Sequence, residues 1–180
     1  DLGAELVPFS PLKDHALPED IQGLYLGGGY PELYASQLEE NAAMRQSIRE
    51  ALEEGLPSIA ECGGFLYLQQ SLDGHAMVGY LPGRAHNTGR LSRFGYVTLE
   101  AREENILCAA GETIPAHEFH YYDTTDNGNA FRARKADGRS WDCGVAAPGF
   151  YAGFPHFHFY AKPSMAARFL DACRKEQDHA

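Results

Sequence analysis

The chain has 180 residues, a formal net charge of −10 and a hydrophobic share of 44%. This length suits one domain with a full core, and no shift in composition divides it. The negative charge argues against nucleic acid or an anionic membrane surface as a partner, because no basic patch would attract phosphate. No apolar run approaches the roughly 20 residues of a membrane span, and no signal-peptide pattern is visible. We therefore expect a cytoplasmic globular protein.

An irregular lead-in and a short strand are the first predicted features. Residues 1–20 have no regular pattern and begin without a methionine, so we expect a linker from a preceding domain and a folded domain over residues 21–180. The apolar run Ile21–Leu26 predicts a strand. It leads into Gly27-Gly28-Gly29, where missing side chains let backbone N–H groups approach a ligand. An ordinary turn has the same composition, and the lack of a nearby lysine argues against phosphate.

A helix, a buried strand and a second helix are predicted next. Ser36-Gln37-Leu38-Glu39 has the pattern of a capping box, and residues 38–54 are mainly helix formers. The apolar run 56–60 predicts a buried strand, residues 61–64 interrupt it, and residues 65–68 suit a helix. This alternation predicts an α/β domain with a mostly parallel or mixed sheet flanked by helices. Chemistry is expected at the carboxyl ends of the strands.

Cys62 lies in the interruption between this strand and helix. A sharp strand-to-helix turn presents a nucleophile, and the small neighbours Ala60 and Gly64 let the two elements close around it, as glycines do in a nucleophile elbow. The amides at the start of the helix favour a thiolate. A buried structural cysteine is the alternative. That second interpretation is preferred for the other three cysteines, which form no C-x-x-C pair: Cys108, Cys143 and Cys173.

The remainder of the chain predicts strands and a closing helix. Residues 77–89 are rich in Gly, Pro, His and Asn and predict a loop, whereas residues 94–99 alternate like a half-exposed strand. Further strands are predicted at 119–122 and 131–135, the latter before an Asp-Gly turn. Residues 164–174 predict a helix. Three of its residues form one packing stripe: Met165, Phe169 and Cys173.

Histidines supply candidates for a general base. A cysteine nucleophile needs such a base, and His156 and His158 lie far downstream, as expected for a pair that meets in space. If their segment is extended, the two face opposite ways. On a strand, Glu118 and His120 would share one face and His117 the other, which splits a candidate metal cluster. We expect hydrogen-bonding support of the active site and no metal, with a His-rich metal-binding module as the alternative.

Five motifs, which occur in order over nearly the whole chain, resemble those of a known protein family. They are Phe9-Ser10-Pro11-Leu12, Leu24-Tyr25-Leu26-Gly27-Gly28-Gly29-Tyr30-Pro31-Glu32-Leu33, Ala60-Glu61-Cys62-Gly63-Gly64, His117-Glu118-Phe119-His120-Tyr121 and His156-Phe157-His158-Phe159. Together they closely resemble the glutamine amidotransferase domain of the cobyrinic acid a,c-diamide synthase family, a class I, triad-type glutaminase. The resemblance implies a three-layer, flavodoxin-like α/β architecture.

The resemblance also implies roles for individual residues. Cys62 is the expected nucleophile, and His156 is the expected base because it aligns with the family's catalytic histidine. Backbone amides of three glycines are expected to bind glutamine and its oxyanion: Gly28, Gly29 and Gly63. Many triad amidotransferases place a glutamate two residues after the histidine, but here that position holds His158. The third member is therefore unassigned, and the expected supporting residues are Glu118, His120 and His158.

The implied function is hydrolysis of L-glutamine to glutamate and ammonia. The ammonia would serve ATP-dependent amidation of the a and c carboxylates of cobyrinic acid in cobalamin biosynthesis. No cofactor is expected in these 180 residues, which contain no G-x-x-x-x-G-K-[ST] loop. An N-terminal synthetase domain would bind ATP, Mg²⁺ and the corrinoid acceptor. A nickel-sirohydrochlorin a,c-diamide synthase or a cell-wall lipid amidase would use the same architecture, and both stay open.

Overall fold

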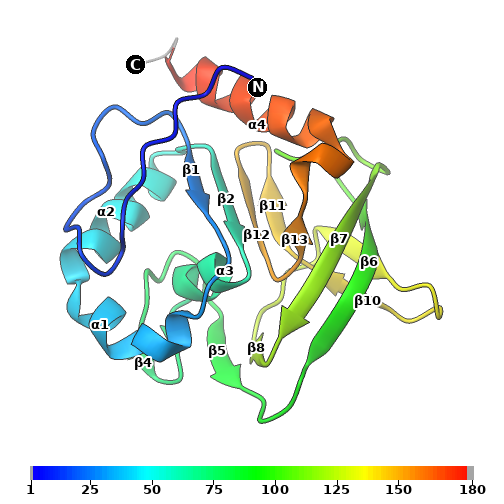
Figure 1. Cartoon of the computed structure of the whole chain (residues 1–180), viewed down its shortest axis with the longest axis horizontal. Helices are drawn as coiled ribbons and strands as arrows, with labels where there is room; N and C mark the ends of the chain where they lie inside the picture. Colours follow the sequence, from blue (N-terminus) through cyan, green and yellow to red (C-terminus); the bar gives the residue numbers. More distant parts are fainter. Residues whose placement is uncertain (1, 178–180) are drawn as a thin grey trace.

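The middle layer of the fold is a four-stranded mixed sheet with strand order β1-β2-β12-β11. The computed structural model describes residues 2–177 (Figure 1). Strands β1 (Leu24–Leu26), β2 (Ser58–Glu61) and β12 (Phe150–Gly153) are parallel, whereas β11 (Val145–Ala147) runs antiparallel to β12. The predicted α/β class with a mixed sheet is confirmed. The carboxyl ends of three parallel strands consequently meet at one edge.

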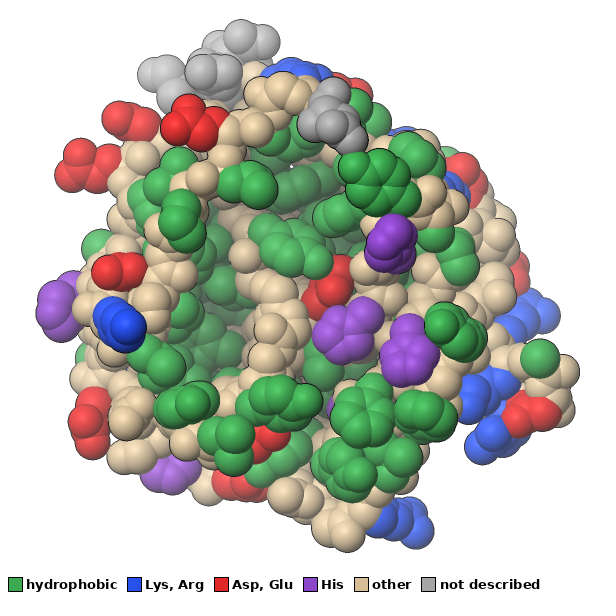
Figure 2. All heavy atoms as spheres, viewed as in Figure 1, with side chains coloured by type: hydrophobic (Ala, Val, Ile, Leu, Met, Phe, Trp, Pro, Cys, Tyr) green, Lys and Arg blue, Asp and Glu red, His purple; other side chains and the backbone are tan. Residues whose placement is uncertain are grey.

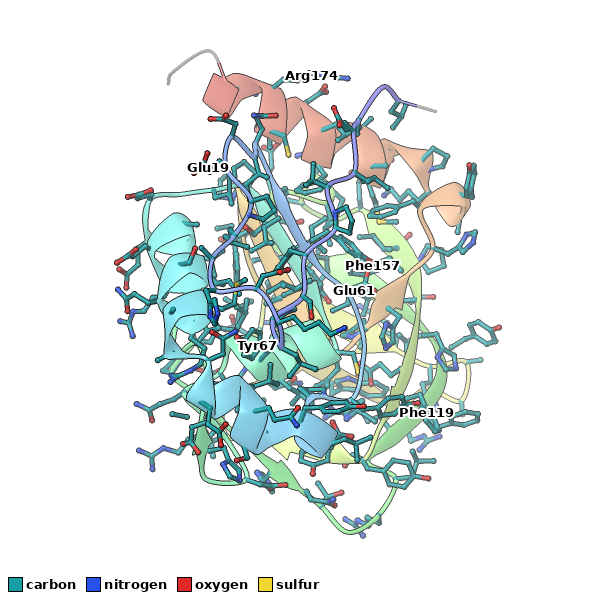
Figure 3. All side chains as sticks on the ribbon, turned by 60° about the vertical axis from the view of Figure 1, so that its left-hand side comes forward. Glu19, Glu61, Tyr67, Phe119, Phe157 and Arg174 are labelled. Carbon is teal, nitrogen blue, oxygen red and sulfur yellow. The ribbon has the colours of Figure 1, made fainter. Side chains whose placement is uncertain are left out.

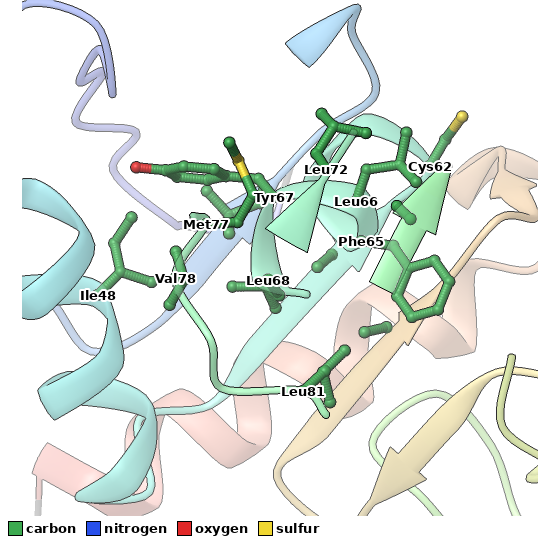
Figure 4. Close-up of a cluster of buried hydrophobic side chains, with 14 of the residues drawn as sticks. Ile48, Cys62, Phe65, Leu66, Tyr67, Leu68, Leu72, Met77, Val78 and Leu81 are labelled. Atoms are coloured by element: carbon green, nitrogen blue, oxygen red, sulfur yellow. The ribbon is translucent and has the colours of Figure 1, made fainter. Parts of the chain in front are cut away.

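Helices cover one face of this sheet (Figure 1). They are η1 (Pro31–Tyr34), α1 (Ala35–Glu40), α2 (Ala42–Glu53) and α3 (Gly63–Leu68). Met44, Ile48 and Leu52 recur at four-residue spacing, so one stripe of α2 is buried. Ala60 of β2 belongs to the same cluster of buried side chains, which Figure 4 shows around α3. This cluster fixes α3, and with it the turn that precedes α3.

An antiparallel sheet covers the other face of the middle layer. Its strand order is β10 (Ser140–Cys143), β9 (Phe131–Arg134), β6 (Arg93–Ala101), β7 (Thr113–His120) and β13 (His156–Phe157). Ile59 and Tyr151 are fully buried against it, and α4 (Pro163–Gln177) adds Met165 to the same cluster. The three expected layers are therefore present, but an antiparallel sheet together with α4 forms the third layer.

Smaller elements connect these layers. A second four-stranded sheet has the order β4 (His75–Ala76), β3 (Ser71–Leu72), β5 (Arg84–Asn87) and β8 (Tyr122–Thr124). The short helix η2 spans Phe159–Ala161. The predicted loop over residues 77–89 is wrong at β5, because these residues pair with β3 and β8. Among residues 2–177, no helix has the length and apolar character needed to span a membrane.

The predicted helix over residues 38–54 is interrupted at Asn41. The capping-box prediction is wrong, because α1 already begins at Ala35 and Ser36 Oγ bonds Glu40 instead. The Asn41 side chain accepts a bond from Met44 N and so caps α2. Its amide nitrogen also donates to two carbonyls of the lead-in, at 2.8 Å each: Pro11 and Asp14. The lead-in is irregular, as predicted, and it packs against α2.

Candidate active site

Cys62 forms the turn between β2 and α3 by itself. The strand ends at Glu61 and the helix begins at Gly63. Cys62 has φ 48° and ψ −97°, a backbone conformation that non-glycine residues rarely adopt and that clusters at functional sites. Its N–H donates to the Gly153 carbonyl at 2.8 Å, and its sulfur points away from the buried cluster (Figure 4). The predicted sharp strand-to-helix turn is confirmed.

The glycine loop lies directly against this turn. Gly64 N donates to the Gly27 carbonyl at 3.2 Å. A Cβ atom on Gly63 would lie 2.7 Å from both N and O of Gly29, which is closer than real Cβ contacts allow. A Cβ atom on Gly64 would overlap the Leu26 carbonyl. Glycine is needed here because two backbone segments touch, and the expected amide groups of the loop and of α3 are consequently brought together.

His156, the first residue of β13, lies beside the glycine loop. A Cβ atom on Gly28 would lie 2.6 Å from Cε1 of His156, so the imidazole rests on the glycine loop. The Cys62 thiol and the Glu61 carboxylate beside the ring raise the pKa of His156 to about 10. A raised pKa favours the protonated, positively charged form of the His156 imidazole at neutral pH. Figure 2 shows histidine side chains among hydrophobic ones on this face of the molecule.

Glu61 is the residue that sequence reasoning missed. Its side chain is only 5% exposed, and its Oε2 lies 3.3 Å from Nδ1 of His156. Its Oε1 accepts a bond from the Phe157 N–H at 3.4 Å, and Figure 3 shows the two residues side by side. Burial and the Glu61 carboxylate together raise the pKa of the Tyr25 hydroxyl. The available signal was an acidic residue that ends an apolar strand immediately before the nucleophile.

Glu118 and His120 lie on the buried face of β7. Both are almost fully buried and His117 is not, so the predicted division of this motif between two faces is confirmed. Glu118 accepts a bond from Trp141 Nε1 at 3.4 Å. The His120 ring stacks on Phe154 with centroids 3.8 Å apart. His120 thus packs against the segment that leads to His156.

His158 lies beyond the end of β13 and is exposed. Its ring lies 5.9 Å from that of Tyr160. The group at Nδ1 of His156 is Glu61, in place of the candidates His158 and Glu118. Over residues 2–177, no cluster of three or more His, Cys, Asp or Glu side chains is arranged to hold a metal ion.

The other three cysteines are free and buried, as predicted. Burial raises the pKa of the Cys108 thiol. It raises the pKa of Cys143 to about 12 and that of Cys173 to about 11. None of these sulfurs has an imidazolium partner of the kind that Cys62 has in His156.

Comparison with known proteins identifies the family. The model of the CobB/CobQ-like glutamine amidotransferase domain matches residues 1–164. The chain belongs to this family. The domain is 41% identical, over 96% of its length, to cobyrinate a,c-diamide synthases of Caldanaerobacter subterraneus and Salmonella typhimurium. It is also 41% identical, over 96% of its length, to the hydrogenobyrinate a,c-diamide synthase of Streptomyces coelicolor.

The domain is shorter than these relatives. It spans 40% of the length of the first two and 35% of the third. Among solved structures, a glutamine amidotransferase superposes with a TM-score of 0.59 at 18% identity, covering 86% of this domain and 80% of that chain. A putative GMP synthase component of Thermoplasma acidophilum has a TM-score of 0.55 at 15% identity, covering 89% and 76%. These two likenesses support the fold alone.

Proposed function

We propose that this domain hydrolyses L-glutamine to glutamate and ammonia, with Cys62 as nucleophile and His156 as general acid and base. The observation that carries this proposal is the convergence of three elements. A cysteine on a strained turn, a positively charged imidazole and a loop of closely approaching backbone amides meet at the carboxyl edge of the parallel strands. Nucleophile, proton carrier and oxyanion donors are the three parts that acyl transfer requires.

The first half-reaction breaks the amide bond of glutamine. The Cys62 thiolate attacks the side-chain carboxamide carbon, and negative charge develops on its oxygen. Backbone N–H groups of Gly63 and of the Gly28-Gly29 loop stabilise this charge. The imidazolium of His156 gives its proton to the departing nitrogen. The C–N bond then breaks, which leaves ammonia and a glutamyl thioester on Cys62.

The second half-reaction regenerates the enzyme. Neutral His156 removes a proton from water, and the resulting hydroxide attacks the thioester carbon. The same amides stabilise the second oxyanion. The C–S bond breaks and glutamate leaves. The thiolate of Cys62 and the imidazolium of His156 are restored together, so the resting pair is ready for another glutamine.

On this proposal, the ammonia is a substrate for a synthetase. The relatives are synthases that their names connect with a,c-diamides of cobyrinate or hydrogenobyrinate. We therefore propose that a preceding domain binds ATP, Mg²⁺ and the corrinoid and amidates its a and c carboxylates in cobalamin biosynthesis, in the cytoplasm. Residues 1–20 would link that domain to residues 21–180. A nickel-sirohydrochlorin or cell-wall lipid synthase is the alternative, and assay of the full-length protein with each acceptor distinguishes them.

The test of glutamine hydrolysis is Cys62→Ser. The wild type should release glutamate and form a covalent adduct on Cys62 with 6-diazo-5-oxo-L-norleucine, a glutamine analogue with an electrophilic carbon. The variant should lose both reactions and keep its circular dichroism spectrum, because the change is nearly isosteric. Cys173→Ser is the matched control, since both cysteines are 8% exposed, and it should retain both reactions. Undiminished hydrolysis in Cys62→Ser would remove Cys62 from the mechanism.

A further inference from the structure

We infer that Glu61, the residue immediately before the nucleophile, is the positioning residue of His156. The inference rests on the proposed glutamine hydrolysis and assigns the third member of the catalytic group. The Glu61 carboxylate lies at Nδ1 of the imidazole, which also has the Cys62 thiol as a hydrogen-bond partner. Nε2 is therefore the nitrogen that remains for the thiol. The position two residues after His156, where a glutamate is usual in triad enzymes, holds the exposed His158.

Strand register brings Glu61 to the imidazole. Gly153 of β12 is paired with Glu61 of β2, and His156 follows three residues later, at the start of β13. Alternation along β2 puts Glu61 on the same face as Ile59, which packs against the antiparallel sheet. The carboxylate consequently points toward β13. The positive φ of Cys62 then turns the chain, and the Cys62 thiol is a hydrogen-bond partner of the same ring.

The hydrogen bonds of Glu61 satisfy a buried charge. A carboxylate on a side chain that is 5% exposed is costly unless hydrogen-bond donors surround it. Glu61 receives donors from two other strands: His156 Nδ1 at 3.3 Å, Phe157 N at 3.4 Å and the Tyr25 hydroxyl. Tyr25 lies opposite Ile59 and therefore shares the face of Glu61. Every one of these donors lies on the side of the sheet where the imidazole is held.

The position of Glu61 determines which nitrogen of the His156 imidazole carries the proton. A neutral imidazole has one donor and one acceptor nitrogen, and a carboxylate at Nδ1 selects the tautomer with the proton there. Nε2 is then free to accept the proton of the thiol or of water. When the ring is protonated, the carboxylate also stabilises its positive charge. Glu61 therefore acts through His156 and does not need to touch glutamine.

Several other titratable groups surround the pair of His156 and Glu61. They are Cys62 in the turn, Tyr25 on β1, Tyr151 on β12 and His117 on β7, which is paired with His156. Burial raises the pKa of both tyrosine hydroxyls, so they stay neutral while His156 titrates. The Cys62 sulfur and the Glu61 carboxylate are therefore the two neighbouring groups that raise the pKa of His156.

The test compares Glu61→Gln with Tyr25→Phe. The first change keeps the shape of the side chain and removes its charge, whereas the second removes one hydrogen bond to Glu61 and keeps the charge. We expect Glu61→Gln to lower kcat by about 10²–10⁴-fold with little change in KM. The high-pH limb of kcat should also move down by roughly 1 unit or more. Tyr25→Phe should leave that limb in place. Equal losses of kcat in both variants, with no shift in the high-pH limb, would show that Glu61 has only a structural role. That result would overturn the inference.

Two further measurements do not depend on turnover. The rate of Cys62 alkylation by iodoacetamide against pH should differ between the wild type and Glu61→Gln, even if neither hydrolyses glutamine. Failure of the proposed function is thereby distinguished from failure of this inference. In Cys62→Ser, the imidazole ¹⁵N shifts of neutral His156 should show the proton on Nδ1, with Glu61 unaltered. A proton on Nε2 in that spectrum would also overturn the assignment.

Discussion

Replacing Gly28 with alanine tests how closely the glycine loop controls His156. A Cβ atom at this position would lie 2.6 Å from Cε1 of the imidazole, whereas ordinary contacts of this kind begin at 3.4 Å. The ring or the loop must therefore move by about 0.8 Å. The ring is held by Glu61 at 3.3 Å, so a retreat of this size stretches that bond or turns the ring away from Cys62.

The expected cost follows from this displacement. A misplacement of about 1 Å can lower a catalysed rate by roughly 10²-fold, which corresponds to about 2.7 kcal/mol of transition-state stabilisation. We therefore expect Gly28→Ala to lower kcat by about 10- to 100-fold. Stability should change by less than about 1 kcal/mol, since the imidazole is partly exposed and no apolar core atom is displaced.

Glutamate release and urea unfolding measure both quantities. Gly27→Ala is the matched control in the same loop, because a Cβ atom there would meet Tyr25 Cε1 at an ordinary 3.5 Å. It should keep a rate within about threefold of the wild type. An unchanged kcat in Gly28→Ala would refute the argument. An equal loss in Gly27→Ala would show that the effect comes from stiffening of the loop and not from the contact with His156.

His156→Ala should lower turnover by about 10²–10⁴-fold, whereas His158→Asn should cost less than about threefold because His158 is exposed beyond the strand; kinetics that reverse this order contradict the choice of base. Protonation of His156 should stabilise the fold, because the Cys62 thiol and the Glu61 carboxylate raise its pKa from 6.5 to about 10. This contribution is complete below pH 6.5 and is lost as pH rises through about 10, so the difference in unfolding free energy between wild type and His156→Ala should narrow over that range. If the difference in unfolding free energy between the two proteins does not change with pH, the stabilising role of protonated His156 is contradicted. Equimolar iodoacetamide at pH 7 should modify Cys62 and spare the other three thiols, because burial raises the pKa of each of them: Cys108, Cys143 and Cys173. Peptide mapping that finds the label on any of these three would contradict this prediction.

Local patterns were sufficient to predict the strand-to-helix turn at Cys62. The apolar run before Cys62 and the small residues after it have few alternatives to a buried strand that breaks into a helix, and β2 and α3 follow that expectation. The strand predicted at residues 21–26 is present at Leu24–Leu26. The closing helix is present as α4. Each of these elements is specified by residues within a few positions of one another.

Contacts between distant residues explain why the role of Glu61 and the helix break at Asn41 were not predicted from the sequence. Glu61 bonds His156 across 95 positions, through a strand register that no local pattern encodes. The break in the predicted helix arises similarly, because the side chain of Asn41 is also bound to Pro11, 30 residues earlier. The segment that carries β12 and β13 is rich in aromatic residues and lacks clean alternation. Its strands are defined by their partners β2 and β7.

The proposed nucleophile and its proposed base belong to different layers of the molecule. Cys62 follows β2 of the middle sheet, whereas His156 lies on β13 of the antiparallel sheet, and the chain crosses between the sheets after Gly153. The distance from sulfur to imidazole is therefore a measure of how the two sheets sit against each other. A protein surface that shifts the outer sheet by a fraction of an ångström would change the rate of ammonia release, without contact with glutamine or with either reacting side chain.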